Sequence, residues 1–435
     1  MVSMAVRRYP WIVEHMVGTV PPLTIKDIII NVPYREGGDP KHCCDIYCPP
    51  SATRRASSSS SSSTTHSADA QLRPVVIHFH GGGWVAGDRA YDIFGSPSMC
   101  NAYASAGLVA IAPSYRLRGL TWHGNPHAHI EDAVCVVQWV TSHIQQFGGD
   151  PGRIYISGHS AGANIAALLG VSGAPRIRER IPDGTIKGVV AISGLYTLRG
   201  IFRGLRSVQE WPVQSRFVSN TFGQDDPVLL HENSPCSILG ASVPSLAAAA
   251  APGTSSVPGG SDGERTSDGM TDTITNSITE IASTITGSAT GTTANPELQY
   301  YSSAEQARLS DPTVAPTLVR ARSQLPPFVL INAYSDMGLE TNAARFQSLL
   351  RSHGVQAQHQ SVMASGTNHA TISWTTEAHQ YAVDFIRRCD GSPPINHQPA
   401  TNTTATTASA SAPSSSSSPS SSRSVSSSWW RSSSG

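Results

Sequence analysis

The chain has 435 residues and carries 30 Lys and Arg against 30 Asp and Glu, which gives a formal net charge of zero at pH 7. Nucleic acids and anionic membrane surfaces are bound through clustered Lys and Arg, so this neutral balance argues against both kinds of partner. No stretch approaches the roughly 18 apolar residues that a membrane-spanning helix needs, and the N-terminal residues lack the sustained apolar run of a secretory signal. The composition therefore predicts a cytoplasmic protein without a transmembrane segment.

Low-complexity sequence interrupts the chain three times. Residues 51–71, 238–296 and 390–435 consist largely of Ser, Thr, Gly, Ala and Pro. Such segments bury too little apolar surface to offset the conformational entropy lost on ordering, so we expect all three to be disordered. The remaining residues form an N-terminal segment with the first strands (1–50) and one folded core in two parts (72–237 and 297–389).

Short apolar runs alternate with helix-like blocks along the two parts of the core. Strands are expected at 75–80, 108–112, 154–157, 189–193, 328–332 and 358–363. Helices are expected at 130–146, 161–169, 340–353 and 376–388. Continuous apolar strands separated by helices predict an α/β fold, with a mostly parallel sheet that is covered by helices on both faces. Ligands of such a sheet bind at the carboxyl ends of its strands.

The seven cysteines include no C-x-x-C pair. Cys43, Cys44 and Cys48 lie close to His42, but zinc sites normally draw their ligands from two separated pairs, and a second pair is missing. We expect these cysteines to be small apolar residues of a strand. The sequence therefore predicts no metal site.

The strongest chemical motif is G-x-S-x-G at Gly158–Gly162, directly after an apolar run and before a helix-like block. Small residues two positions on either side of Ser160 allow a sharp, strained strand-to-helix turn that projects the hydroxyl into a cleft. The turn also places the hydroxyl at a helix N-terminus, where unpaired N–H groups favour developing negative charge. Ser160 is therefore the expected nucleophile.

A second glycine-rich motif, HGGGW at 80–84, also ends an apolar run and lies 80 residues before the serine motif. Acyl transfer passes through a tetrahedral oxyanion that needs two or three aimed N–H donors. Consecutive glycines let the backbone present such donors without a side chain in the way. We assign the donors to Gly82, Gly83 and Ala161, the last being the residue after the expected nucleophile.

An acid and a base are expected further along the chain. A carboxylate is needed to fix the imidazole tautomer and to stabilise the imidazolium. Asp336 lies just beyond the apolar run at 328–332 and is the expected acid, with Glu340 as the reserve candidate. His369 lies in a loop that follows the strand-like residues 358–363, and it is the expected base because its position and loop context agree.

The two motifs, with the Asp and His downstream, resemble the esterase/lipase branch of the α/β-hydrolase superfamily. Within that branch, the H-G-G-x-W pattern is similar to the arylformamidase, prenylcysteine methylesterase and carboxylesterase-like groups. The resemblance covers roughly 75–235 and 325–389 and implies the order Ser, Asp, His along the chain. It also implies the α/β-hydrolase fold with a small cap, which we place near 196–222.

Residues beside the motifs take expected roles from this resemblance. We expect Trp84 and His159 to contact the substrate, although Trp84 can equally pack beneath the oxyanion loop and His159 can simply fill the variable position of its motif. His80 is expected to order the oxyanion loop. Arg116 and Asp132 match positions of a buried polar network, for which a scaffold role is expected.

The expected function is hydrolysis of a carboxylic ester by a serine hydrolase that needs no cofactor and acts on a small-molecule substrate. Arylformamidase and prenylcysteine methylesterase activities are narrower alternatives with the same chemistry. A hydrolase fold used only for binding is an alternative of a different class, because fold does not dictate function. The sequence does not predict the oligomeric state.

Overall fold

The computed structural model describes the residues 25, 27–37, 39–50, 71–90, 95–118, 125–198, 222, 226–240, 302–310 and 319–392. Apart from its ends, the expected cap near 196–222 lies outside these residues, as do most of the three low-complexity segments.

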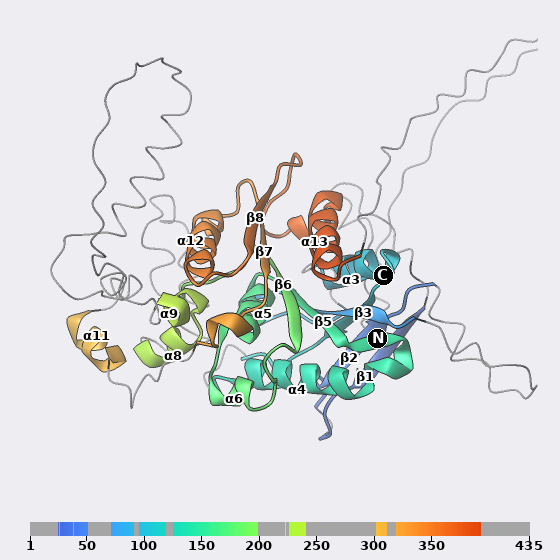
Figure 1. The fold of residues 1–435 in the computed structure, drawn as a ribbon, viewed down its shortest axis with the longest axis horizontal. Helices are drawn as coiled ribbons and strands as arrows, with labels where there is room; N and C mark the ends of the chain where they lie inside the picture. The colour runs from blue at the N-terminus through green and yellow to red at the C-terminus, as the bar shows by residue number, and fades with distance from the viewer. Residues whose placement is uncertain are drawn as a thin grey trace, which may run out of the picture. The chain divides into compact units, whose positions relative to one another are not determined.

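An eight-stranded sheet runs through the described residues in the order β1-β2-β4-β3-β5-β6-β7-β8 (Figure 1). Its strands are β1 Ile28–Pro33, β2 Cys43–Tyr47, β3 Arg73–Phe79, β4 Val109–Pro113, β5 Gly149–His159, β6 Ile186–Ile192, β7 Phe328–Ala333 and β8 Ala357–Val362. Strand β2 pairs antiparallel with β1 and with β4, and the other neighbours pair parallel. The expected α/β fold with a mostly parallel sheet is therefore confirmed, and each expected strand lies within a few residues of an observed one.

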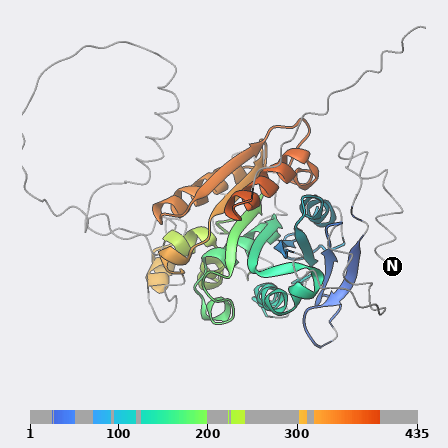
Figure 2. The same cartoon turned by 45° about the vertical axis from the view of Figure 1, so that its right-hand side comes forward.

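Helices cover both faces of this sheet (Figure 2). The described helices of eight or more residues are α3 Ser96–Ser105, α4 Ala128–His143, α5 Ala161–Val171, α11 Ser303–Ser310, α12 Leu339–Ser352 and α13 Thr376–Cys389. The shorter ones are α6 Pro175–Arg178, α8 Pro227–Glu232 and α9 Pro235–Gly240, with single turns of 3₁₀ helix at Ile144–Phe147, Arg322–Gln324 and Ile372–Trp374. Helices α3 and α13 pack together on one face, and α4, α5, α9 and α12 contact one another in series on the other.

The alternation of side chains along β3 explains why both faces are covered. Val75, Ile77 and Phe79 join a continuous apolar cluster with residues of α4, α5 and α12. His78 points to the opposite face, where its Nδ1 lies 2.9 Å from the Ser157 hydroxyl oxygen. Because successive residues of a strand point to opposite faces, a strand that is buried throughout needs helices on both sides.

Several described elements were not expected from the sequence, and two of them bear on the packing of the core. Helix α3 is not among the expected helices, because eight of its ten residues are buried and an apolar stripe on one side is missing. Helix α9 runs to Gly240 and buries Ile238 and Leu239 in the main apolar cluster. The packed core thus extends three residues into the range 238–296.

The crossing of β5 and α5 depends on glycine. A Cβ built on Gly158 would lie 2.2 Å from the carbonyl oxygen of Gly162, and a Cβ on Gly162 would lie 2.1 Å from the carbonyl oxygen of Phe79. Both contacts are far shorter than van der Waals distance and both involve backbone, which cannot rotate away. Any side chain at these positions would therefore push α5 off the sheet.

We expect Gly162→Ala to lower the free energy of unfolding by about 1–3 kcal/mol, the usual cost of overpacking. Urea denaturation of the purified variant and the wild type measures this difference. Gly152→Ala is the matched control, because a Cβ there meets only the side-chain oxygen of Asp150, at 3.2 Å. Equal stability of Gly162→Ala and wild type would contradict the close approach of α5 to β3.

Candidate active site

Ser160 lies on the turn between β5 and α5, with φ 54° and ψ −117°. Positive φ is unfavourable for a residue with a Cβ, and such strain persists where the surrounding structure enforces it. Here the Ser160 N–H donates to the carbonyl of Ile192 at 2.8 Å, and the Ser160 carbonyl accepts from Asn164 at 3.1 Å. The turn is therefore tied to β6 on one side and to the first turn of α5 on the other.

His369 connects Ser160 to Asp336. The Nε2 atom of His369 lies 2.9 Å from the Ser160 hydroxyl oxygen, and its Nδ1 atom lies 2.9 Å from Oδ1 of Asp336. These three residues are far apart in the sequence and come from the ends of β5 and β7 and the loop after β8. The structure thus brings the expected nucleophile, base and acid into one hydrogen-bonded series, and Asp336, not Glu340, is the carboxylate that meets His369.

The Asp336 carboxylate is fully buried but well supplied with donors. Its Oδ2 accepts from the Ser193 hydroxyl at 2.5 Å and from the Asn332 side-chain amide at 2.8 Å. Burial alone would raise the pKa of Asp336, but the hydrogen bond and charge of His369, together with the bonds from Ser193 and Asn332, hold it below its usual value. Asp336 is therefore ionised at neutral pH.

Sequence reasoning missed Ser193 and Asn332. Both lie at the carboxyl ends of neighbouring parallel strands, β6 and β7, which is the edge where ligands of such sheets bind. The sequence does show a polar residue at the end of each of these apolar strands. It does not show that the two strands are neighbours, and without that knowledge neither residue could be assigned as a donor to Asp336.

The glycine-rich loop after β3 packs directly against the nucleophile turn. A Cβ on Gly81 would lie 3.3 Å from the Cβ of Ser160 and 2.7 Å from Nδ1 of His159. Gly82 and Gly83 have φ values of 112° and 60°, which glycine adopts readily. Ala161 is the first residue of α5, so its N–H has no carbonyl one turn earlier to bond within the helix. Ala161 is thus adjacent to Ser160 in the chain, and Gly82 and Gly83 directly follow Gly81, which packs against Ser160.

The N-terminal hairpin braces this loop. Lys41, between β1 and β2, donates to the carbonyl of Gly87 at 2.9 Å and pairs with Asp88 at 3.0 Å. Arg89 donates to Asp45 of β2 at 2.9 Å. These contacts join segments about 45 positions apart in the sequence, so no local pattern could have predicted them.

His80, the first residue of the glycine-rich loop, stabilises this loop through contacts with Tyr115. Its ring stacks on Tyr115 at a centroid distance of 4.2 Å, and the Tyr115 hydroxyl donates to the His80 carbonyl at 2.8 Å. Burial lowers the pKa of His80 to about 4, so the ring is neutral at physiological pH. The expected ordering role of His80 thus has a structural basis in these contacts.

Trp84 and His159 are each about 1% exposed. Trp84 packs edge-on against Phe222 at a centroid distance of 4.9 Å and lies beside His129. His159 lies next to the loop of His369, with Nε2 2.8 Å from the His369 carbonyl oxygen. In this structure Trp84 therefore contacts other aromatic rings, and His159 contacts the loop that carries His369, here called the base loop (364–371).

Arg116 and Asp132 form the buried polar network expected of them. The Asp132 carboxylate is fully buried. It accepts from the side chains of Arg116 at 2.8 Å and Arg35 at 3.1 Å, and also from the backbone N–H of Arg116 at 2.8 Å. The nearby His42 lies 3.2 Å from the same carboxylate. The network joins the N-terminal hairpin to α4, which is a scaffold function.

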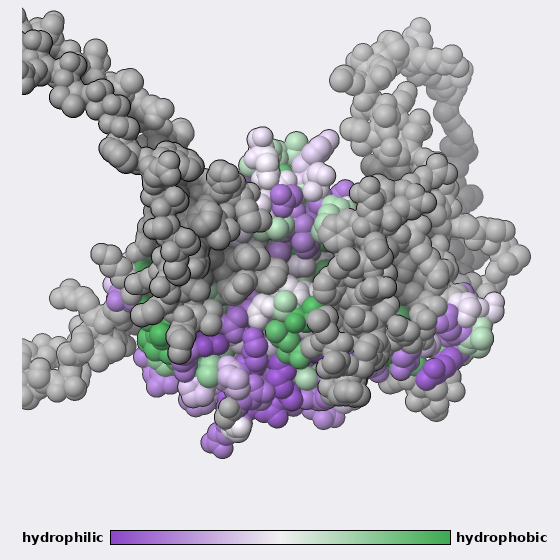
Figure 3. All heavy atoms as spheres, turned by 180° about the vertical axis from the view of Figure 1, so that it is seen from behind, coloured by the Kyte–Doolittle hydropathy of each residue, from purple (hydrophilic) through white to green (hydrophobic). Residues whose placement is uncertain are grey.

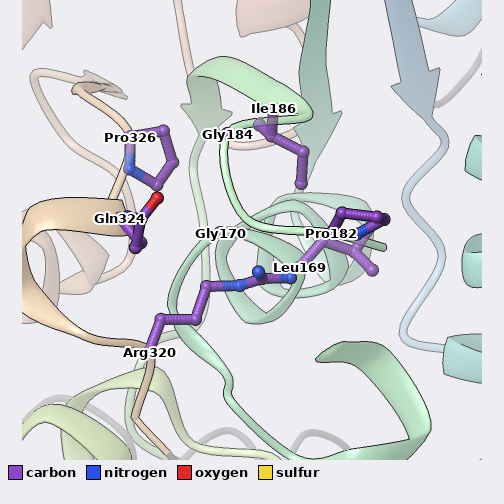
Figure 4. Close-up of a pocket in the computed structure, with 8 residues that line it drawn as sticks. All are labelled: Leu169, Gly170, Pro182, Gly184, Ile186, Arg320, Gln324 and Pro326. Carbon is purple, nitrogen blue, oxygen red and sulfur yellow. The ribbon is translucent and has the colours of Figure 1, made fainter. Parts of the chain in front are cut away.

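The pocket in Figure 4 lies elsewhere. It lies between the end of α5, the start of β6 and the segment around Arg320, and its cavity volume is only about 10 Å³. Arg320 is paired there with Asp183 at 2.5 Å. Because β5 and β6 are parallel, the start of β6 lies at the sheet edge opposite Ser160, so this pocket is not part of the site.

Within the described ranges, His, Cys, Asp and Glu side chains form no group of three or more that is arranged to hold a metal ion. The described helices also include none that is long and apolar enough to cross a membrane. The described surface seen from behind in Figure 3 is largely hydrophilic with small apolar patches.

Part of this chain is similar in sequence to known proteins. Residues 64–247 match the family model described as BD-FAE. Esterase LipC of Mycobacterium tuberculosis is 32% identical over 124 residues, which cover 28% of this chain and 29% of LipC. Esterase LipI of the same organism is 41% identical over 103 residues, 23% of this chain and 30% of LipI. The chain thus matches less than a third of the length of these curated relatives.

A solved structure extends the likeness to the whole fold. Esterase B of Lactobacillus rhamnosis has a TM-score of 0.54 and 15% identity, and the superposition covers 90% of this chain and 93% of that one. At this identity the likeness concerns the fold alone. The described residues thus have the fold of an α/β hydrolase, with a mostly parallel sheet and a serine on the turn between β5 and α5. In sequence, parts of the chain are similar to the BD-FAE family model and to the two esterases.

We expect Ser193→Ala to lower the free energy of unfolding at pH 7 by about 1.5–3 kcal/mol, the usual worth of a hydrogen bond to a charged group. The pKa of Asp336 is lowered in the folded state, so its charge contributes stability above the unfolded value of about 3.9. That contribution is lost as the pH falls through the folded pKa. The deficit of Ser193→Ala should therefore shrink in acid.

Urea denaturation at pH 7 and near pH 3 measures both deficits. Ser352→Ala is the control, because the Ser352 hydroxyl donates to the neutral carbonyl of Leu349 at 2.8 Å, and its deficit should not follow the charge of Asp336. A deficit of Ser193→Ala that is the same at both pH values would contradict the link to Asp336.

Proposed function

We propose that this protein is a serine hydrolase that cleaves carboxylic esters of small molecules by two-step acyl transfer. The observation that carries the proposal is the hydrogen-bonded series from Ser160 through His369 to Asp336, with Ser160 held on a strained turn. The names of the relatives LipC and LipI, both esterases, support an ester as the substrate class.

In the first step His369 takes the proton of the Ser160 hydroxyl through Nε2, and the serine oxygen attacks the ester carbonyl carbon. The carbonyl oxygen becomes an oxyanion that accepts from the backbone N–H groups of Gly82, Gly83 and Ala161. His369 then gives the proton to the alkoxide oxygen as its bond to carbon breaks, and the alcohol leaves. Ser160 is now acylated.

In the second step a water molecule loses a proton to His369 and attacks the acyl carbon. The tetrahedral intermediate collapses, the proton returns to Ser160, and the carboxylic acid is released. Ester and water give acid and alcohol, so the steps balance without a further reactant. Throughout, Asp336 holds the His369 ring in the tautomer with Nδ1–H and stabilises the imidazolium.

A fluorophosphonate probe reports an activated serine before the physiological substrate is known. We expect a stoichiometric adduct on Ser160, which peptide mass mapping locates. His369→Ala should abolish labelling, because the base that activates Ser160 is removed. The exposed His143 bonds only to its own helix, at the Trp139 carbonyl, so His143→Ala is the control that should label like wild type. No adduct on folded wild-type protein would instead favour a hydrolase fold used for binding.

The oxyanion donors are tested by Gly82→Ala. Gly82 has φ 112°, and a Cβ there would lie 2.2 Å from the Ala86 carbonyl oxygen, so the loop must shift. Loss of one aimed donor typically lowers kcat roughly 10²- to 10³-fold, and we expect a loss of this order with p-nitrophenyl acetate. Gly184→Ala is the matched control, because Gly184 also has positive φ but a Cβ there meets nothing within 4 Å. Equal losses in the two variants would contradict the assignment.

A further inference from the structure

His159 has no part in the steps above, yet it lies between three of the segments that perform them. It directly precedes Ser160, and its ring centroid is 5.1 Å from that of His369. Its Nε2 atom is 2.8 Å from the carbonyl oxygen of His369. On its other side the ring packs against Gly81, where a Cβ would lie only 2.7 Å from Nδ1 of His159. One buried ring therefore touches the nucleophile turn, the base loop and the oxyanion loop.

The hydrogen bond to His369 determines the tautomer of His159. A carbonyl oxygen can only accept, so Nε2 of His159 must carry the hydrogen. Burial, and next the charge of His369, lower the pKa of His159 to about 3, so the ring is neutral and Nδ1 carries a lone pair. Nδ1 is buried and has no hydrogen-bond partner. The position of this ring is thus set by its single bond from Nε2–H.

The loop that carries His369 has little else to hold it. Among the described residues, the backbone and side-chain bonds of 364–371 are otherwise made within the loop, as between Asn368 and Thr371, or to Ile372 and Trp374 directly after it. The remaining ties are the two bonds of the His369 ring. The bond to Ser160 must break and re-form during the proposed reaction, whereas the bond to Asp336 joins the loop to the end of β7. Within the described ranges, the bond from His159 is therefore the one hydrogen bond that can join this loop to the end of β5 throughout the reaction.

We propose that His159 is a positioning residue: its Nε2–H fixes the peptide of His369 so that the imidazole meets Ser160 and Asp336 at the same time. The inference rests on the proposed function. Catalytic groups held by a locked second layer of contacts keep their geometry, and a displacement of about 1 Å can cost two orders of magnitude in rate. His159 supplies such a contact without touching the substrate.

Three substitutions separate this role from simple packing. Gln places its amide nitrogen near the position of Nε2, Asn places it near that of Nδ1, and Leu has no donor. With p-nitrophenyl acetate we expect His159→Leu and His159→Asn to lose kcat roughly 10- to 100-fold with KM within about twofold. His159→Gln should recover most of the lost kcat. The rate of fluorophosphonate labelling should follow the same order.

Thermal unfolding of each variant shows whether it is folded, and the Asn and Gln variants remain comparable even if Leu is not tolerated. Equal kcat in the Gln and Asn variants, or wild-type kcat in His159→Asn, would overturn the positioning role. If wild type reacts and all variants match it, the positioning role alone is wrong. If wild type neither hydrolyses the ester nor takes the label, the proposed function falls as well.

Discussion

Three backbone segments approach one another closely at the turn between β5 and α5. Gly158 passes the carbonyl of Gly162, Gly162 passes that of Phe79, and Gly81 lies against the Cβ of Ser160. This packing enforces the positive φ of Ser160, which would otherwise relax. The rest of the candidate site is aligned to this turn, because the oxyanion loop packs on it directly and the His369 loop is bonded to it.

Hydrogen bonds to the Asp336 carboxylate are the second requirement of the candidate site. Asp336 is buried, and an isolated carboxylate in such a place would take up a proton. It stays ionised because His369 bonds one oxygen while Ser193 and Asn332 bond the other. These donors also fix the orientation of the carboxylate that accepts from the imidazole of His369. Charge and geometry are therefore supplied by the same few contacts at the ends of β6 and β7.

The antiparallel hairpin of β1 and β2 supports the glycine-rich loop, although it contributes no residue to the candidate site itself. Lys41 and Arg89 join the β1–β2 hairpin to the residues that follow the glycine-rich loop, and Asp132 joins the same hairpin to α4. Bonds to buried or half-buried charges are among the stronger polar contacts in proteins. The loop that presents Gly82 and Gly83 is thus anchored at both ends, by β3 before it and by the hairpin after it. The proposed mechanism requires a loop anchored in this way, because an oxyanion is stabilised by preorganised donors.

The sequence by itself determined six of the eight strands, the fold class and the positions of Ser160 and the glycine-rich loop, because these follow from apolar runs and from local backbone requirements within a few residues. It also put forward Asp336 and His369, each from its place after a strand. Only the tertiary structure decided that Asp336 rather than Glu340 meets His369, since that contact depends on how β6, β7 and β8 pair. The bond from His159 joins residues 210 positions apart and arises only when the sheet has brought their loops together. Long-range contacts of this kind leave no periodic signal in the chain, whereas a strained turn requires its glycines in place.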